Sequence, residues 1–310
     1  MPFDYPVRTV SVPRRSYYMQ PISEKYYDHA MQMVKNAVYS GVVDENSVYQ
    51  EANLKNRAII DSIIDDLLQP GSRIVGIENL DKLAAESDAG ASCLILMEHY
   101  SNFDIPCLFY LLKNGNDATR AISDRIVAMA GMKLNEDSPF VQAFAEAYTR
   151  IVIYPSRSLE TVTDPKKRAE EQRRSNSLNR AALREMIRCK HNGKLVLMFP
   201  SGTRYRPGKP ETKRGVKEVD SYVKSFDQMV LIGIAGSILR LHPSGEMSKD
   251  YIEHDRVVYT VGPIVSCRDF RDSVRESIEP GAEPKQAVAD AIMAELEKLH
   301  EWSEQVRAGD

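Results

Sequence analysis

From residue 72 onward, short apolar runs alternate with helical segments, and this alternation constrains the fold more than any other feature. The apolar runs that predict strands, many of them rich in Ile and Val, are 73–77, 92–98, 150–154, 195–199, 229–235 and 256–264. The segments that predict helices are 79–86, 104–114, 138–147, 168–189 and 284–305. Continuous apolar strands separated by helices are typical of a sheet that is buried on both faces. We therefore predict an α/β fold with a mixed, largely parallel sheet covered by helices.

The first 71 residues show a different pattern, which predicts a small helical N-terminal domain. Residues 1–22 have no clear periodicity and are interrupted by prolines. From Ser23, apolar residues that include Tyr27 and Met31 recur at three- and four-residue steps, and a second such segment ends at Pro70-Gly71. The predicted organisation is a helical domain over 1–71 followed by an α/β domain over 72–310.

Composition excludes several classes of protein. Of the 310 residues, 43% are hydrophobic and 27% are charged, as in globular proteins rather than disordered or fibrous ones. No apolar run reaches eighteen residues, and the N-terminus lacks the basic and apolar regions of a secretory signal. The four cysteines are scattered without metal-ligand spacing, which predicts reduced thiols and no metal site. Nothing beside Cys107 marks an activated thiolate, so we expect it to be a core residue. We expect a soluble, cytoplasmic protein.

A histidine and a carboxylate directly follow the apolar run 92–98. His99 and Asp104 are five positions apart, so a turn between strand and helix can bring their side chains together. At neutral pH an imidazole can take a proton from a hydroxyl, and a carboxylate on its other nitrogen fixes the tautomer. The alternative is a loop histidine with no catalytic role beside an ordinary helix N-cap at Asp104.

Two arginines follow the apolar run 195–199. Arg204 and Arg206 lie in a turn punctuated by Gly and Pro, where planar guanidiniums can bind one phosphate group. Arg157, after the run 150–154, is a third candidate. Because His99, Arg157 and Arg204 each follow a predicted strand, we expect them at one edge of the sheet. The alternative is that the arginines belong to solvated basic loops.

Together these segments resemble the glycerolipid acyltransferases. That family carries a histidine and an aspartate separated by four residues, and a downstream Phe-Pro-x-Gly-Thr-Arg motif. The matching residues here are, in order, His99, Asp104, Pro200, Gly202, Thr203 and Arg204. The resemblance covers roughly residues 72–265 and implies that 72–310 is an acyltransferase catalytic domain.

Within this family, the chain is most similar to the soluble, plastid-type glycerol-3-phosphate acyltransferases. Their Pro-Ser-Gly-x-Arg-x-Arg-Pro segment is matched by residues 200–207. Three positions, in two segments, depart from the family pattern. Arg157-Ser158 stands where the plastid type has Lys-His, so a third phosphate contact is only half supported, and Glu98 stands where the wider family typically has Asn before the histidine.

The resemblance implies direct acyl transfer without a covalent enzyme intermediate. His99 would take the acceptor's proton and Asp104 would hold the imidazole, while Arg157, Arg204 and Arg206 would bind the phosphate of glycerol 3-phosphate. The oxyanion donors would lie near the turn at Ser201, Gly202 and Thr203. No bound cofactor is expected; an acyl carrier protein or coenzyme A thioester is the co-substrate.

A basic segment offers a surface for the acyl donor. Residues 164–194 carry a local charge excess of +6 in a chain of net charge −3. Arg173, Arg180 and Arg184 form one stripe of the predicted helix, which suits acidic acyl carrier protein, the phosphates of coenzyme A or an anionic membrane surface. The alternative is an ordinary amphipathic surface helix. No nucleic-acid partner is expected.

Two other functions stay open at this point. The first is a 1-acylglycerol-3-phosphate (lysophosphatidate) acyltransferase, which uses the same histidine and aspartate but an acceptor that already carries one acyl chain. The second belongs to a different class, a non-catalytic module that binds a carrier protein or a phospholipid.

Overall fold

Strand β3 (Cys93–Met97) lies in the middle of the sheet and is fully buried. Its Ile95 packs into the core on one face, whereas Leu94 and Leu96 pack into the core on the other face. Successive side chains of a strand point to opposite faces, so a continuous apolar run fits a strand covered on both sides. These contacts come from a computed structural model, which describes residues 20–39, 41–279 and 281–309.

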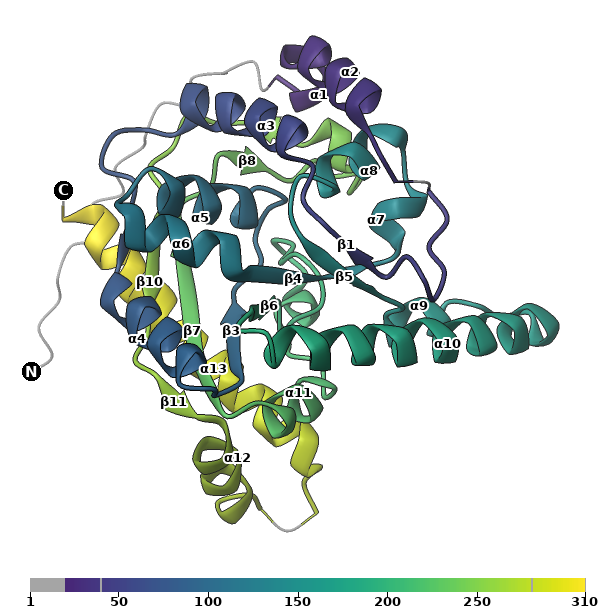
Figure 1. The fold of residues 1–310 in the computed structure, drawn as a ribbon, viewed down its shortest axis with the longest axis vertical. Helices are drawn as coiled ribbons and strands as arrows, with labels where there is room; N and C mark the ends of the chain where they lie inside the picture. The colour runs from purple at the N-terminus through teal and green to yellow at the C-terminus, as the bar shows by residue number, and fades with distance from the viewer. Residues whose placement is uncertain (1–19, 40, 280, 310) are drawn as a thin grey trace, which may run out of the picture.

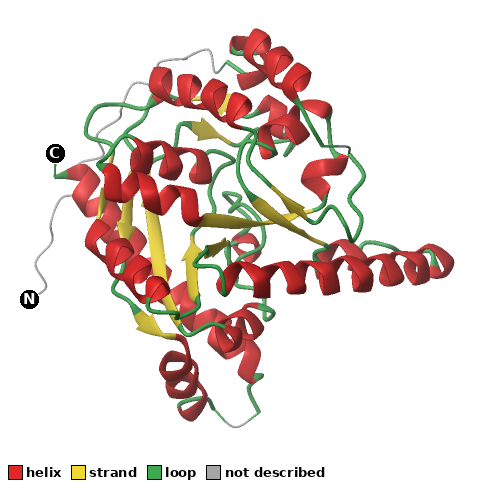
Figure 2. Ribbon diagram, viewed as in Figure 1, coloured by secondary structure: helices red, strands yellow, loops and turns green. Residues whose placement is uncertain are grey.

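Within the described residues, one nine-stranded sheet forms the centre of the molecule (Figures 1 and 2). Its strands, in spatial order, are β1 (Tyr49–Gln50), β5 (Arg150–Ile153), β4 (Ile126–Gly131), β6 (Leu195–Met198), β3, β7 (Gln228–Ala235), β10 (Val258–Val261) and β2 (Arg73–Val75), with β11 (Val265–Ser266) paired to β7. The neighbours from β5 to β7 run parallel, as do β10 and β2, whereas β1, β10 and β11 pair antiparallel with β5 or β7. The predicted mixed, largely parallel α/β sheet is confirmed.

Helices cover both faces of this sheet. The helices that share the core of Ile95 are α3 (Leu54–Leu67), α4 (Ile77–Asp88), α5 (Asp104–Lys113) and α6 (Asp117–Arg125). The helices that share the core of Leu94 are α10 (Pro165–Lys190), α11 (Val219–Ser225), α12 (Cys267–Glu276) and α13 (Pro284–Ala308). In Figure 1, α4, α5 and α6 lie in front of the sheet and α13 lies behind it.

Shorter elements complete the described chain. They are α1 (Ile22–Lys25), α2 (Tyr27–Asn36), α7 (Lys133–Glu136), α8 (Pro139–Ala145), α9 (Ser156–Glu160), the hairpin β8 (Leu239–Arg240) with β9 (Tyr251–Ile252), and two 3-10 turns at Pro210–Thr212 and Met247–Lys249.

The N-terminal helices contact the α/β domain closely. Ile60, Ile64 and Leu67 of α3 are fully buried in the same core as the sheet, and β1 adds an edge strand to it. The predicted boundary after residue 71 stays a prediction, and residues 1–19 of that predicted domain lie outside the described residues. On α2, Tyr27 and Met31 are exposed although they belong to the predicted apolar periodicity.

The predicted strands correspond to β2, β3, β5, β6, β7 and β10, but the structure adds elements that the sequence pattern missed. The most important is β4, whose sequence Ile-Val-Ala-Met-Ala-Gly contains small residues with weak strand preference and directly follows a helix. Among the missed helices are α6, α11 and α12.

The parallel strands place the candidate residues at one edge of the sheet. β3, β6, β4 and β5 run in the same direction, so their carboxyl ends share that edge. His99, Arg204 and Arg157 follow β3, β6 and β5, as predicted.

Candidate active site

His99 lies two residues beyond β3, and two contacts fix its ring. Its Nδ1 lies 2.9 Å from Oδ2 of Asp104, so the predicted contact between the two side chains is present. The ring stacks on Phe199 with 3.7 Å between centroids and 3° between planes. The His99 side chain is 17% exposed, and its Nε2 makes no hydrogen bond within the described residues. The second ring nitrogen is therefore left for a substrate.

Asp104 is held by the turn that precedes its own helix. It is 3% exposed, and its Oδ2 accepts the backbone N–H groups of Tyr100 at 2.6 Å and Ser101 at 2.9 Å. The Ser101 hydroxyl donates to Oδ1 at 3.1 Å. An ordinary N-cap would instead accept from N–H groups inside the helix that it starts. Asp104 thus presents a fixed carboxylate to His99, which favours the tautomer with its proton on Nδ1.

The turn after β6 lies beside His99. Gly202 adopts a φ of 63°, which favours glycine, and its N–H donates to the Phe199 carbonyl at 3.0 Å. The Ser201 hydroxyl donates to the Thr203 carbonyl at 2.8 Å. The backbone N–H groups of Ser201 and Thr203 have no acceptor in the described part of the chain. Within residues 201–203, these two groups are therefore free donors in the described structure.

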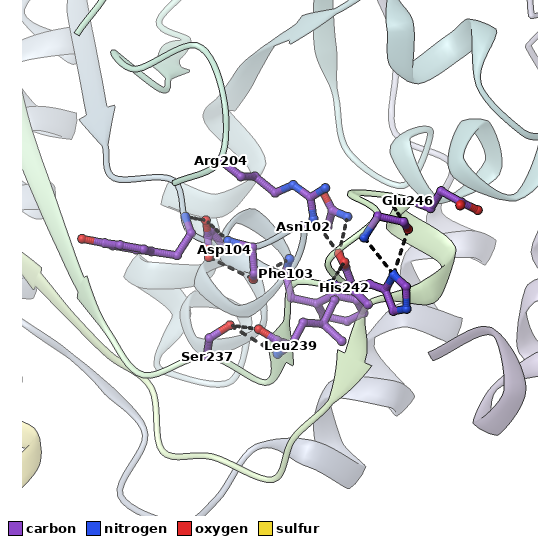
Figure 3. A network of polar contacts seen from close by, with 12 residues as sticks. Asn102, Phe103, Asp104, Arg204, Ser237, Leu239, His242 and Glu246 are labelled. Carbon is purple, nitrogen blue, oxygen red and sulfur yellow. Dashed lines mark hydrogen bonds and ion pairs between the residues drawn. The ribbon is translucent and has the colours of Figure 1, made fainter. Parts of the chain in front are cut away.

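Two contacts join the His99 turn to the turn after β6. The Tyr205 N–H donates to the His99 carbonyl at 2.8 Å. Asp250 is fully buried, and its Oδ2 accepts from Arg204 at 2.5 Å and from Asn102 at 3.4 Å, while its Oδ1 accepts the N–H of His242 (Figure 3). Arg204 therefore uses one end of its guanidinium to hold the two turns together.

A narrow pocket, with room for about one water molecule, opens at His99. The residues that line it are Glu98, His99, Tyr100, Ser201, Tyr205, Thr212, Lys213 and Met293. None of the three predicted phosphate ligands is among them. Arg204 is 8% exposed against Asp250, and Arg206 is exposed with its guanidinium near Gly245.

Arg157 lies in a second, larger cleft next to the His99 pocket. It is exposed on α9 and makes no ion pair within the described residues. Arg214 and Lys217 line the same cleft, together with carboxylates that include Glu283 and Asp290. The structure thus brings His99, Asp104 and Ser201 together, whereas the segment 213–216 separates Arg157 from them.

A comparison with protein families bears on this arrangement. The family model named Acyltransferase matches residues 72–232, which is more than half of the chain. The chain belongs to the acyltransferase family. A comparison with curated proteins finds no match. The matched part of this acyltransferase contains the His99 turn and the turn after β6, and it ends within β7, so α13 lies outside it.

A buried polar cluster, which the sequence did not predict, lies next to His99. Glu98 is 3% exposed; its Oε1 accepts the Tyr100 hydroxyl at 2.7 Å and its Oε2 accepts the Ile234 N–H at 2.8 Å. His300, on α13, lies 3.4 Å from Oε2 and donates from Nδ1 to the Ile234 carbonyl at 2.6 Å. Burial raises the pKa of the Tyr100 hydroxyl far above its ordinary value, so it remains a donor to Glu98.

A glycine in β7 allows this cluster to form. A Cβ atom at Gly233 would lie 2.5 Å from the backbone of Leu299 and 2.6 Å from the backbone nitrogen of His300. Only a residue without a side chain lets α13 approach β7 this closely. Glu98 could be recognised in the sequence as a departure from the family pattern, whereas no motif near His300 indicated that it belongs to this cluster.

We expect His300 to stabilise the fold of this acyltransferase more at low pH than at high pH. Its contact with Glu98 raises the pKa of the His300 imidazole above the ordinary value of 6.5. A group whose pKa is higher when folded stabilises fully below its unfolded pKa, and this contribution disappears as pH rises through the folded value. Tyr100 and Lys213 also face this ring.

The measurement is urea unfolding of wild type and His300→Gln from about pH 5.5 to pH 9, a range that spans the ordinary histidine pKa. The wild-type advantage should be largest at the acidic end and should shrink toward the alkaline end. A difference between the two proteins that does not change with pH would contradict the charged contact.

The remaining predicted features can also be located. Arg173, Arg180 and Arg184 are exposed on α10, whose N-terminal end extends beyond the rest of the molecule in Figure 1; their role in docking stays a prediction. Cys107 is buried and its pKa is raised by burial, which fits a core residue. Among the described residues, no group of His, Cys, Asp and Glu is arranged to hold a metal ion. No helix in that same part of the chain is long and apolar enough to cross a bilayer.

Proposed function

We propose that this acyltransferase moves a fatty acyl group from an acyl thioester to a hydroxyl of glycerol 3-phosphate, the first step of phospholipid synthesis. The observation that supports it most directly is the fixed contact between His99 and Asp104, with the other imidazole nitrogen free beside the Ser201 turn. Acyl carrier protein or coenzyme A carries the thioester.

In the proposed reaction His99 acts first as a base. Its Nε2 takes the proton of the acceptor hydroxyl while that oxygen forms a bond to the thioester carbonyl carbon. Collapse of the tetrahedral intermediate breaks the carbon–sulfur bond, and the thiol leaves with the proton that His99 carries. Asp104 stabilises the imidazolium between these steps because its carboxylate already faces Nδ1.

The free N–H groups of Ser201 and Thr203 are the proposed donors to the oxyanion. They belong to a turn whose conformation is fixed by the Gly202 N–H and the Ser201 hydroxyl. Donors that are already oriented stabilise developing charge without reorganisation at the moment of reaction. Gly202 supports the turn instead, because its own N–H is used by Phe199.

Arg157 and Arg206 remain proposed phosphate ligands, since both are exposed and unpaired within the described chain. Arg204 keeps donors that Asp250 does not use, but its contact with Asp250 adds a positioning role. The stripe of Arg173, Arg180 and Arg184 is the proposed dock for the acidic carrier protein or for coenzyme A phosphates.

The test is a thiol-release assay of the purified protein with one palmitoyl thioester and three acceptors. We expect glycerol 3-phosphate to be used well and free glycerol very poorly, because a dianionic phosphate gains charged hydrogen bonds that glycerol lacks. Preference for 1-acylglycerol 3-phosphate would show that the proposed acceptor is wrong, but the proposed roles of His99 and Asp104 would stand. Equal use of glycerol and glycerol 3-phosphate would contradict the proposal that the enzyme recognises a phosphate group. Thiol release that no acceptor accelerates would contradict acyl transfer to an alcohol.

A further inference from the structure

The His99 pocket is lined by a lysine that the sequence motifs do not include. None of Arg157, Arg204 and Arg206 lines the His99 pocket, whereas Lys213 does. Lys213 lies 9 residues after Arg204, beyond the turn at Pro210–Thr212, and belongs to the segment that separates the pocket from the larger cleft.

Two tyrosines and a carboxylate hold the Lys213 ammonium. Its Nζ lies 5.9 Å from the ring centroid of Tyr100 and 5.7 Å from that of Tyr205, and the two rings meet edge to face. Nζ also forms an ion pair with Glu297 of α13. Ring contacts attract an ammonium without using its N–H groups, so donors remain for another anion.

The backbone around Lys213 is anchored on both sides. The Lys213 N–H donates to the Pro210 carbonyl at 2.9 Å, and the Val216 N–H donates to the Pro200 carbonyl at 2.9 Å. Gly215 packs against α13, where a Cβ would lie 3.0 Å from the Ala289 carbonyl oxygen. The backbone from which the Lys213 side chain extends is therefore anchored before a substrate arrives.

The ion pair with Glu297 is one that a substrate can displace. The Lys213 and Glu297 side chains are 30% and 44% exposed, and pairs in contact with water contribute only about 0–1 kcal/mol. Glu98, the carboxylate that lines the same pocket, is already covered by Tyr100 and His300, which reduces its repulsion of an incoming anion.

We propose that Lys213 binds the phosphate group of the acyl acceptor beside His99, exchanging its ion pair with Glu297 for that phosphate. The proposal rests on the proposed function, because it assumes that the acceptor carries a phosphate monoester. It makes Lys213 a determinant of acceptor recognition, with Tyr100 and Tyr205 orienting it.

The test compares Lys213→Met, Lys213→Arg and Glu297→Gln with wild type. Calorimetry measures binding of glycerol 3-phosphate and of inorganic phosphate, and steady-state assays measure KM for acceptor and donor separately. Loss of one charged hydrogen bond predicts weaker glycerol 3-phosphate binding and a higher acceptor KM in Lys213→Met, by about 10- to 150-fold. Lys213→Arg should recover part of this affinity, and donor KM should stay the same.

Glu297→Gln should act in the opposite direction. Removing the competing carboxylate should tighten binding of both phosphate ligands, and unchanged or weaker binding would overturn the exchange. An unchanged acceptor KM and unchanged phosphate binding in Lys213→Met would overturn the role of the lysine.

Inorganic phosphate separates this proposal from the proposed function. Phosphate that binds wild type but binds Lys213→Met more weakly supports the site even if the assays show another acceptor. Failure of phosphate to bind wild type would overturn the site even if acyl transfer to glycerol 3-phosphate is observed. If 1-acylglycerol 3-phosphate is the better acceptor, Lys213→Met should raise its KM in the same way, because it carries the same phosphate monoester.

Discussion

Replacing His99 by alanine is expected to lower the rate of acyl transfer at least ~10²-fold, the scale of a lost general base. The Nε2 atom of His99 makes no hydrogen bond among the described residues, so it is available to act as the base. A water molecule in the variant would lack the fixed position that Asp104 and Phe199 give to the imidazole. The fold should persist, because His99 lies on a turn and its side chain is partly exposed. The measurements are thiol release and urea unfolding of the same preparation.

Two further variants make this result specific. Asp104→Asn should also lose activity, because an amide can support the wrong tautomer of His99. His191→Ala removes an exposed histidine just after α10 and should leave the rate unchanged. Near-normal turnover by a folded His99→Ala protein would end the proposed mechanism.

Replacing Arg204 by alanine is expected to lower the free energy of unfolding by about 3–5 kcal/mol, the cost of breaking a buried ion pair. Asp250 is fully buried, and among the described residues its carboxylate would keep only hydrogen bonds to Asn102 and a backbone N–H without Arg204. The loss should also loosen the contact between the two active-site turns, so kcat should fall together with stability.

Arg206→Ala is the matched control, because Arg206 lies two positions away but is exposed and has no ion pair in the described part of the chain. Its unfolding free energy should change by no more than about 0.5 kcal/mol. The double variant Arg204→Met with Asp250→Leu should regain part of the lost stability, since it leaves no unpaired charge. Equal stability of Arg204→Ala and Arg206→Ala would show that the buried pair contributes nothing.

Much of the fold was predictable because its strands are buried on both faces. A run such as Cys93–Met97 is apolar at every position, so the sequence alone predicts it as a buried strand. β4 was missed because its alanines and glycine resemble a helix or a loop, and it is a strand only because β5 and β6 pair with it. The exposure of Tyr27 and Met31 on α2 likewise depends on neighbours that periodicity does not reveal.

The candidate site was predictable only where its contacts are local. His99 and Asp104 are five residues apart, so one turn decides whether they meet. The partner of Arg204 lies 46 residues away at Asp250, and Tyr100 meets His300 across 200 residues. Spacing along the chain carries no information about such pairs, so it identified Arg204 without its neutralising partner and did not identify His300.

The close approach at Gly233 connects the interior of the sheet to substrate recognition. One added methyl group there would push α13 outward, and Met293, Glu297 and His300 would move with it. All three contribute to the pocket or to residues that line it. We therefore expect a substitution at Gly233 to impair activity in the way that a substitution in the active site would, although Gly233 does not line the pocket.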